Sequence, residues 1–345
     1  MLGGALWYPF AALPGPLAPA SAGVSLARNP GRIGTILRHP TINASSEGLH
    51  DGAKPSGLSS WMAYLNLTKP RLLPMVLFTG LPLLGLAAGG WPSPGFSLAV
   101  LLGVALAAAS ANALNAWVER DLDARMERTR RRPLPAGELT SSAALRFAVA
   151  LGFLSTALLG ALGGWVSASL CVSSILFYVF VYTIWLKPRT AWNTVVGAVA
   201  GAAAPILADA TINGSVGLAG FSLFAIVFAW QPPHVFAIAL YRKAEYEAAG
   251  VVMLPTAIGD AATRRWIVVL SLALIPVGLL PYFAGFAGPV YVGVALLATF
   301  GFIGSAIHLL FQASDDAARW VFRASLGWLF AIFLAINLEI VFRTL

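Results

Sequence analysis

Long apolar stretches, separated by short polar or charged segments, recur along this chain from residue 72 to residue 342. Each is about 17 to 25 residues long, the length that an α-helix needs to cross the hydrocarbon core of a membrane. The stretches are continuously apolar and lack the alternating pattern of barrel strands, so we expect helices. The pattern predicts an all-α, polytopic membrane protein, a bundle of nine transmembrane helices at residues 72–89, 95–118, 142–164, 167–186, 194–210, 218–238, 266–284, 289–311 and 319–342.

Composition and charge agree with a membrane protein. The 345 residues are 58% hydrophobic and only 10% charged, and the mean hydropathy of +0.79 is too high for a soluble chain of this length. The net charge of +8 would by itself suggest a nucleic-acid partner. After residue 57, however, every basic residue except Arg343 falls on one side of the predicted membrane, as in cytoplasmic loops, so we expect no nucleic-acid partner.

Residues 1–57 differ in composition from the rest of the chain. They are rich in Pro, Gly, Ala and Ser, carry four basic residues, and contain no acid before Glu47. No basic residue precedes their first apolar run, which argues against a secretory signal. A disordered extension, an organellar transit peptide and a start codon placed too early all fit this composition. We therefore expect an N-terminal extension over residues 1–57 and one membrane domain over residues 58–345.

Three polar side chains share one face as the second predicted span leaves the membrane. Asn115, Glu119 and Asp123 are spaced four residues apart, whereas Asp121 points to the opposite side. Two acids at this spacing repel each other unless a cation lies near them. Carboxylate and amide oxygens suit a hard ion such as Mg²⁺, which usually shares its coordination with phosphate. Simple pairing with loop arginines is the alternative, and we prefer it for Asp121 and Glu127.

Further charged clusters flank other spans on the same predicted side. The sixth span is followed by "YRKAEYEAAG", which contains Lys243 and Glu245, and the fourth by "LKPRT", which contains Lys187 and Arg189. Acids that hold Mg²⁺ and cations that meet phosphate oxygens are what a diphosphate leaving group needs. An apolar bundle interior would in turn hold a lipid tail. Together these features indicate a site for a polyprenyl diphosphate.

Several strings resemble a known family. The Asn115, Glu119, Asp123 motif resembles that of the intramembrane prenyltransferases of the UbiA superfamily. "LTKPR" at 67–71, "ERTRRRPLPAG" at 127–137, "YTIWLKPRT" at 182–190, "PPH" at 232–234 and "AAGVVMLP" at 248–255 resemble the signatures of its heme O synthase subfamily. The resemblance covers residues 58–342.

The resemblance implies a nine-helix bundle whose cytoplasmic mouth binds Mg²⁺ and farnesyl diphosphate. The implied acceptor is heme B (protoheme IX), whose vinyl group is farnesylated to give heme O for heme–copper terminal oxidases, with a heme A synthase as an expected partner. The implied catalytic and metal-side residues are Asn115, Glu119, Asp123 and Glu245. The implied diphosphate-side residues are Lys69, Arg71, Arg128, Arg132, Lys187, Arg189 and Lys243.

Two strings depart from the family pattern. The second acidic motif usually reads Lys-Asp-Asp-Tyr, whereas this chain has "KAEY" with Ala244 in place of one acid, and Pro188 stands where a basic residue is common. These departures leave the number of metal ions open. His234 is either a ligand of the heme iron or a hydrogen-bonded imidazole at a helix end, and for His308 we prefer the second interpretation.

Two other functions fit parts of the pattern. A prenyltransferase that acts on an aromatic quinone precursor would share the motif around Asn115. A transporter would also have polar clusters, but these usually lie at the membrane midplane, where the predicted spans lack paired ionisable groups. For location we expect the inner membrane of a bacterium with the site on the cytoplasmic side, and the mitochondrial inner membrane is the alternative.

Overall fold

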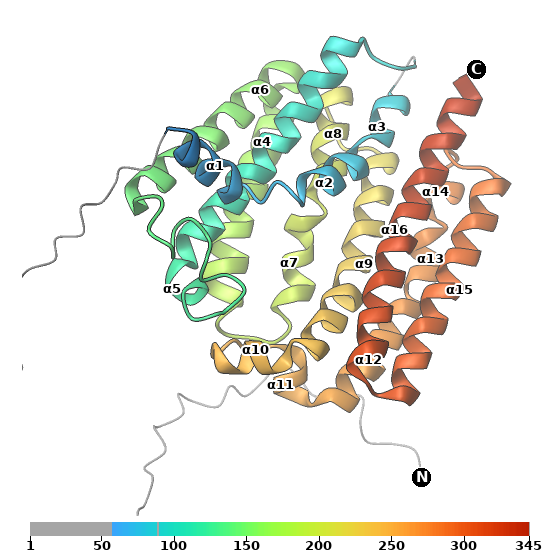
Figure 1. The fold of residues 1–345 in the computed structure, drawn as a ribbon. Helices are drawn as coiled ribbons and strands as arrows, with labels where there is room; N and C mark the ends of the chain where they lie inside the picture. The colour runs from blue at the N-terminus through green and yellow to red at the C-terminus, as the bar shows by residue number, and fades with distance from the viewer. Residues whose placement is uncertain (1–56, 88–89, 345) are drawn as a thin grey trace, which may run out of the picture. The chain divides into compact units, whose positions relative to one another are not determined.

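The computed structural model describes residues 57–87 and 90–344, and every regular element within those ranges is a helix (Figure 1). The described residues belong to one compact unit. The extension expected at residues 1–57 lies outside the described residues, apart from Gly57, where helix α1 (Gly57–Leu67) begins. The following elements are α2 (Leu73–Gly80), α3 (Pro82–Gly85), α4 (Pro94–Val118), α5 (Arg120–Asp123), α6 (Ser141–Leu176), the π-helix η1 (Phe177–Leu186), α7 (Asn193–Gly201), α8 (Ala203–Asn213), α9 (Leu218–Tyr241), α10 (Lys243–Ala248), α11 (Leu254–Ile258), α12 (Asp260–Leu272), α13 (Leu274–Gly278), α14 (Leu280–Phe283), α15 (Pro289–Gln312) and α16 (Asp315–Thr344).

Seven helical segments in the described part of the chain are long and apolar enough to cross a membrane. Large apolar side chains such as Phe153, Leu297 and Phe311 are exposed on these segments, although such residues are normally buried in a soluble protein. The chain is therefore a multi-pass membrane protein. The seven segments are Pro94–Val118, Ser141–Leu186, Asn193–Asn213, Leu218–Tyr241, Asp260–Phe283, Pro289–Gln312 and Asp315–Phe342.

The longest of these segments, Ser141–Leu186, contains two of the predicted spans. At Gly164 the backbone leaves the helical conformation (φ 74°, ψ −166°), which only glycine adopts without strain. The side chains of Ser155 before this break and Cys171 after it are in hydrogen-bonding contact at 3.2 Å. The chain therefore reverses at Gly164, and the two arms of the hairpin correspond to the predicted spans 142–164 and 167–186.

The first predicted span, 72–89, is shorter than expected. Helices α2 and α3 together form only a short apolar segment, Leu73–Gly85. Pro82 begins α3 and lacks the amide hydrogen that a continuous helix would use, so the helical pattern is interrupted there. With this segment and the hairpin, each of the nine predicted spans coincides with an apolar helical segment among the described residues.

The C-terminal helices form the largest buried core. Trp328 of α16 is buried, and its indole nitrogen donates to Thr299 Oγ1 of α15 at 2.8 Å. Trp230 of α9 donates in the same way to the carbonyl oxygen of Ser325 in α16 at 2.7 Å. Because the polar atom of each indole has a partner, these large side chains join three helices without leaving a buried donor unsatisfied.

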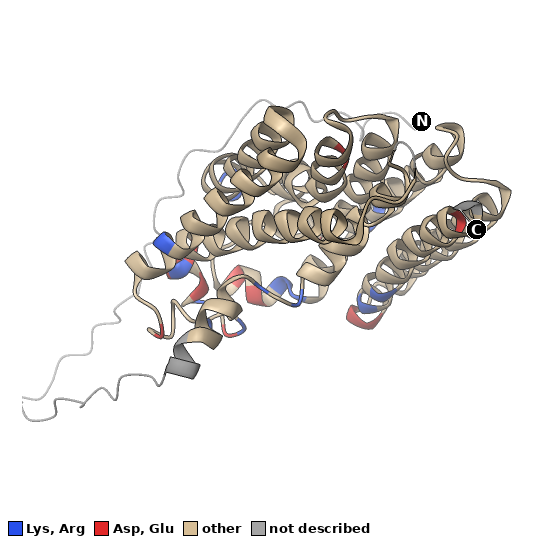
Figure 2. Ribbon diagram, turned by 90° about the horizontal axis from the view of Figure 1, so that it is seen from above, with Lys and Arg blue, Asp and Glu red and all other residues tan. Residues whose placement is uncertain are grey.

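Charged side chains occupy few positions on the ribbon, which consists mostly of other residues (Figure 2). Helices α5, α10 and α11 lie at the same end of the bundle (Figure 1). Ion pairs connect this end: Lys187, just after η1, pairs with Glu119, just after α4, and Arg128 pairs with Glu245 of α10. The helix arrangement thus brings segments that are far apart in sequence to one polar end.

One buried acid within a span has a structural role. Asp209 of α8 accepts hydrogen bonds from the amide nitrogens of Gly217, at 2.7 Å, and Gly220, at 3.2 Å. These amides belong to the start of α9, whose first turn has no intrahelical partners for its N–H groups. Asp209 therefore caps α9 and lies outside the charged cluster described next.

Candidate active site at the polar end of the bundle

Of the three side chains spaced along the end of α4 and α5, Asn115 and Asp123 are buried and Glu119 is 10% exposed. Asn115 is 2% exposed and the Asp123 side chain 5%, whereas the Asp121 side chain is 79% exposed. Helix α4 ends at Val118, but the amide of Asp123 still donates to the carbonyl oxygen of Glu119 at 2.7 Å. The helical register therefore continues through the short break, as the four-residue spacing predicts.

Each of these three side chains has a cationic partner from another part of the chain. Lys69 Nζ donates to Asn115 Oδ1 at 2.8 Å, and Lys187 Nζ forms a short ion pair with Glu119. Arg132 Nη1 lies 2.9 and 2.7 Å from the two carboxylate oxygens of Asp123. Each carboxylate thus has a cation beside it where little water is present, as buried carboxylates require. The site holds two carboxylates, one amide oxygen and three cations, so one positive charge is in excess.

Two of these cations differ in their electrostatic surroundings. Burial, followed by the charge of Arg132, lowers the pKa of Lys69 to about 8. Burial also acts to lower the pKa of Lys187, but the charge and hydrogen bond of Glu119, together with Tyr182 and Tyr246, outweigh it, and the pKa lies above its usual value. Lys69 also has a positive φ of 56°, a strained conformation for a residue with a side chain. Such strain is typical of sites where the surrounding structure fixes a functional group.

The π-helix η1 positions a residue that the sequence analysis did not single out. Thr183 Oγ1 donates to the carbonyl oxygen of Tyr178, five residues earlier, and accepts from Asn115 Nδ2 at 3.2 Å. The wide π turn gives this five-residue spacing, and π-helical turns often occur at functional sites. Thr183 lies within the string "YTIWLKPRT", but apolar periodicity does not distinguish a π-helix from an α-helix. Thr183 fixes the amide orientation of Asn115.

The second acidic motif forms a neighbouring group. Glu245 of α10 accepts from Arg128 at 3.4 Å and from Arg242 at 3.0 Å. Tyr246, the next residue in α10, lies close enough to Lys187 to contribute to its raised pKa. The Arg128–Glu245 pair therefore lies beside the first cluster, as the sequence predicts for the ends of these spans.

Three other residues predicted to bind the diphosphate do not contact the cluster around Asn115 among the described residues. Lys243 pairs with Asp260 at 3.0 Å. Arg189 donates to the carbonyl oxygen of Trp185 at 2.8 Å, and Arg71 is exposed. The cluster around Asn115 thus brings together Lys69, Arg132 and Lys187, while Lys243, Arg189 and Arg71 do not join it.

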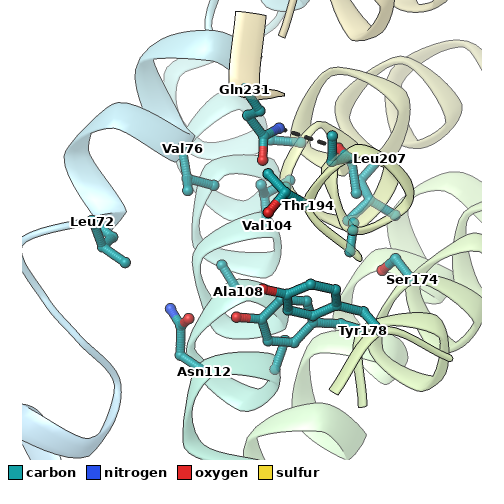
Figure 3. A pocket seen from close by; sticks show the side chains of 18 of the residues that line it. Leu72, Val76, Val104, Ala108, Asn112, Ser174, Tyr178, Thr194, Leu207 and Gln231 are labelled. Carbon is teal, nitrogen blue, oxygen red and sulfur yellow. Dashed lines mark hydrogen bonds between the residues drawn. The ribbon is translucent and has the colours of Figure 1, made fainter. Parts of the chain in front are cut away.

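Figure 3 shows a mostly apolar cavity of the bundle, here called the first cavity, which has a volume of about 280 Å³. Asn112, three residues before Asn115 in α4, lines it, so the cavity begins where the polar cluster ends. Tyr178 and Tyr182 of η1 also line it, with their rings stacked 5.4 Å apart. Deeper in the membrane, Gln231 of α9 donates to the carbonyl oxygen of Ala198 at 3.1 Å. An apolar chain with a charged head fits this combination of cavity and cluster.

The two histidines are placed differently. The His234 Nδ1 atom lies 2.7 Å from Ser325 Oγ. Its ring stacks on Trp230 at 4.4 Å and lies tilted against Phe322 at 5.0 Å, both measured between ring centroids. These contacts lie between α9 and α16, and His234 is not among the residues that line the first cavity. His308 is exposed. The heme-ligand interpretation of His234 stays a prediction.

The sequence of these helices matches a family model, described as the UbiA prenyltransferase family, over residues 76–336. This range includes the acid face of α4 and α5, the π-helix and the second acidic motif. The chain belongs to the UbiA prenyltransferase family.

Two bacterial proteins have sequences similar to that of this chain. The protoheme IX farnesyltransferase of Parvibaculum lavamentivorans is 42% identical over 287 residues, which cover 82% of this chain and 90% of that protein. The protoheme IX farnesyltransferase of Symbiobacterium thermophilum is 43% identical over 279 residues, 80% of this chain and 93% of the relative. The similarity therefore extends over nearly the whole of each relative.

Solved structures of UbiA-type proteins share the fold. The structure described for the biosynthesis of digeranylgeranylglyceryl phosphate synthase superposes with a TM-score of 0.69 at 17% identity, covering 82% of this chain and 99% of that one. A UbiA homologue from Archaeoglobus fulgidus bound to GPP and Mg²⁺ gives a TM-score of 0.55 at 18% identity, with coverage of 80% and 99%. At these identities the likeness concerns the helix arrangement.

The oxygen atoms of the site suit an Mg²⁺ ion that takes part of its coordination from a substrate. The described part of the chain contains no group of three or more His, Cys, Asp or Glu residues that could hold a metal by themselves. Mg²⁺ seldom needs such a cage, since it often takes one or two carboxylates and completes its coordination with water and substrate phosphates. Glu119 and Asp123, with the Asn115 amide oxygen, fit a metal shared with a diphosphate.

Proposed function

We propose that this chain transfers the farnesyl group of farnesyl diphosphate to the vinyl group of heme B, giving heme O for heme–copper terminal oxidases. The observation that carries this proposal is the agreement of more than 40% of residues, over almost their full length, with protoheme IX farnesyltransferases. The polar cluster beside an apolar cavity supports it, because a prenyl diphosphate combines a charged head with an apolar chain.

In the proposed reaction, the bond between C1 of the farnesyl chain and its diphosphate oxygen breaks, and diphosphate leaves with the electron pair. The vinyl group of heme B forms the new carbon–carbon bond. Water then adds to the remaining vinyl carbon and gives up a proton to solvent or to the released diphosphate. The chain must therefore neutralise a leaving group, hold the farnesyl chain, and keep stray water from its reactive end.

The cations of the cluster would stabilise the leaving group. Lys69, Lys187 and Arg132 now pair with the oxygens of Asn115, Glu119 and Asp123. On binding, phosphate oxygens would take over part of these contacts, and the freed carboxylates would hold Mg²⁺, which offsets the phosphate charge. Arg128 and Glu245 would act from the neighbouring group. Preorganised charges of this kind are usually the largest contribution to such a rate.

The apolar part of the site would orient the donor. The first cavity would hold the farnesyl chain, and the stacked rings of Tyr178 and Tyr182 would cover it near C1. Thr183 would keep the Asn115 amide oxygen directed at the metal side by accepting from its nitrogen. His234 stays a candidate ligand of the heme iron, reached from the α9–α16 side.

We also propose a location and a partner. The curated relatives come from bacteria, and the basic connections lie at the end of the bundle that bears the cluster. This supports a bacterial inner membrane with the active site on the cytoplasmic side. A heme A synthase would be a consumer of the product.

Analysis of hemes in a bacterial host that lacks heme O tests the proposed function. Hemes extracted from membranes with the wild-type chain should include a heavier, more apolar heme that bears a hydroxyethylfarnesyl group. Membranes with Asp123→Asn at equal protein level should contain heme B and little of the new pigment. Heme B as the sole pigment in the presence of folded wild-type protein would contradict the proposal.

A further inference from the structure

A second cavity adjoins the first. It has a volume of about 220 Å³ and is lined almost entirely by apolar side chains, among them Leu170, Phe177, Ile206 and Phe224. Four residues line both cavities: Ser174, Ala200, Ala203 and Leu207. The two cavities are therefore adjacent, and the small side chains of Ala200, at the end of α7, and Ala203, at the start of α8, lie at the boundary between them.

The second cavity lies farther from the polar cluster than the first. In the second arm of the hairpin, Tyr182 and Tyr178 line only the first cavity, whereas Leu170 lines only the second. In α9, Gln231 lines the first cavity and Phe224 the second, about 10 Å deeper at 1.5 Å per helical residue. A chain whose head lies at the cluster would pass through the first cavity before reaching the second.

The volumes indicate how much of the donor each cavity can hold. An apolar cavity of about 150 Å³ accommodates one benzene molecule, or about 25 Å³ for each carbon atom. By that measure the first cavity, at about 280 Å³, holds about eleven carbons, close to two isoprene units. The farnesyl chain has three units, so its last unit needs further apolar space.

We propose that the second cavity receives the terminal isoprene unit of the donor and that Ala200 and Ala203 set the donor length that the enzyme prefers. This inference rests on the proposed function. Each alanine contributes only a methyl group at the junction of the cavities, and α7 and α8 are interrupted beside them at Ala202. A branched side chain at either position would narrow the passage without touching the polar cluster.

Donor binding by the purified full-length chain in Mg²⁺ tests this proposal. Calorimetric dissociation constants would be measured for farnesyl diphosphate and for geranyl diphosphate, which has two isoprene units. Ala203→Leu should weaken the binding of farnesyl diphosphate at least tenfold and the binding of geranyl diphosphate less than threefold. The matched control is Ala108→Leu, because Ala108 lines only the first cavity. It should weaken both donors by similar factors.

A second variant keeps the test decisive if Ala203→Leu lowers the melting temperature too far for measurement. Ile206→Trp fills the second cavity alone and should give the same selective loss of farnesyl diphosphate. Equal weakening of both donors, or unchanged affinity for farnesyl diphosphate in a folded variant, would overturn the proposal.

Heme analysis separates this result from the proposed function. Wild-type protein that makes heme O but shows no change of donor preference in these variants refutes only the length inference. Suppose instead that Ala203→Leu selectively weakens the binding of farnesyl diphosphate but the wild-type protein leaves heme B unmodified. That result refutes heme B as the acceptor and leaves the length inference standing.

Discussion

At the scale of single residues, paired charges allow acids to lie buried at the ends of apolar helices. An unpaired buried carboxylate is costly, and removing one partner of a buried pair usually costs more than the pair contributes. Asp123 and Glu119 meet this condition through Arg132 and Lys187. Because these cations are also suited to phosphate, the contacts that stabilise the buried acids would be exchanged when substrate binds.

The first prediction compares two neighbouring aspartates. Asp123→Asn should lower the rate of farnesyl transfer by about 10²–10³-fold, because it keeps the shape but removes a charge on the metal side. Asp121→Asn should change the rate little, since Asp121 is exposed and pairs with the neighbouring Arg120 at 3.6 Å. Initial rates with purified variants would measure both effects. Similar losses of rate in the two variants would contradict the assignment of the catalytic role to the buried face of α5.

A second prediction concerns the altered acidic motif. Glu245→Ala should raise the Mg²⁺ concentration needed for half-maximal rate and slow turnover, while Glu245→Asp should retain substantial activity. The control is Glu247→Ala, because Glu247 is half exposed and its nearest cation, Lys243, is 3.9 Å away. A Mg²⁺ titration of rates distinguishes them. Wild-type behaviour of Glu245→Ala across the titration would remove Glu245 from the site.

The residue spacing in the sequence predicts which side chains share a face but not which partners they take. Asn115, Glu119 and Asp123 were expected together, and the structure buries them together. Their pairing with Lys69 and Lys187 depends on connecting segments that lie 46 and 68 residues away in sequence. Arg189 and Lys243 looked equivalent to Lys187 in the sequence, but local carbonyl and carboxylate oxygens bind them instead.

At the scale of helices, small residues decide how closely the spans approach. An added Cβ at Gly163 would lie 2.3 Å from the Thr211 Cα atom of α8, and one at Gly197 would lie 2.3 Å from the Tyr182 ring. In membranes such glycines permit close packing that large side chains prevent. Gly197 therefore lets Tyr182 cover the first cavity, while Gly163 lets the turn of the hairpin contact α8.

A third prediction tests this close approach. Gly163→Ala should destabilise the protein by about 1–3 kcal/mol, because the backbone of Thr211 cannot move as a flexible side chain would. Gly293→Ala in α15 is the matched control, since its added Cβ meets nothing within 4 Å and alanine favours a helix. Thermal unfolding in detergent would report both. An unchanged melting temperature for Gly163→Ala would refute the contact with α8.

Hydropathy predicted where the helices lie but not their internal irregularities. The positions of the spans agree because burial in lipid needs continuous apolar length, although the first apolar segment, Leu73–Gly85, is shorter than predicted. The π-helix η1, the break at Ala202 and the positive φ of Lys69 arise from tertiary contacts that a one-dimensional pattern does not contain. Residues of η1 and residues on both sides of the break at Ala202 line the first cavity, so its lining was not predictable from the sequence.

At the scale of the whole molecule, the asymmetric distribution of basic residues implies a fixed orientation. The connections at the polar end carry the arginines and lysines, whereas the loops around residues 90–94 and 213–217 carry none. In the proposed orientation, the site would bind the diphosphate group at the cytoplasmic surface of the membrane. Its apolar substrates would reach it from the cytoplasmic leaflet.

A fourth prediction tests the orientation. In a Cys171→Ser background, cysteines at Ala136 and Ala261 should react with an impermeant thiol reagent only from the cytoplasmic side, and cysteines at Ser93 and Ser215 only from outside. All four positions are exposed, so accessibility depends on the side of the membrane. Labelling of Ala136 and Ser215 positions from the same face would contradict the nine-span topology.

The proposed acceptor, heme B, distinguishes this chain from prenyltransferases of quinone synthesis. A competition between two acceptors tests this proposal most directly. Purified protein would receive farnesyl diphosphate, Mg²⁺ and equal concentrations of heme B and 4-hydroxybenzoate, with all products identified by mass spectrometry. We predict farnesylated heme bearing a new hydroxyl group, no farnesylated benzoate, and no product when a chelator removes Mg²⁺. Farnesylated 4-hydroxybenzoate together with unmodified heme B would contradict heme farnesylation.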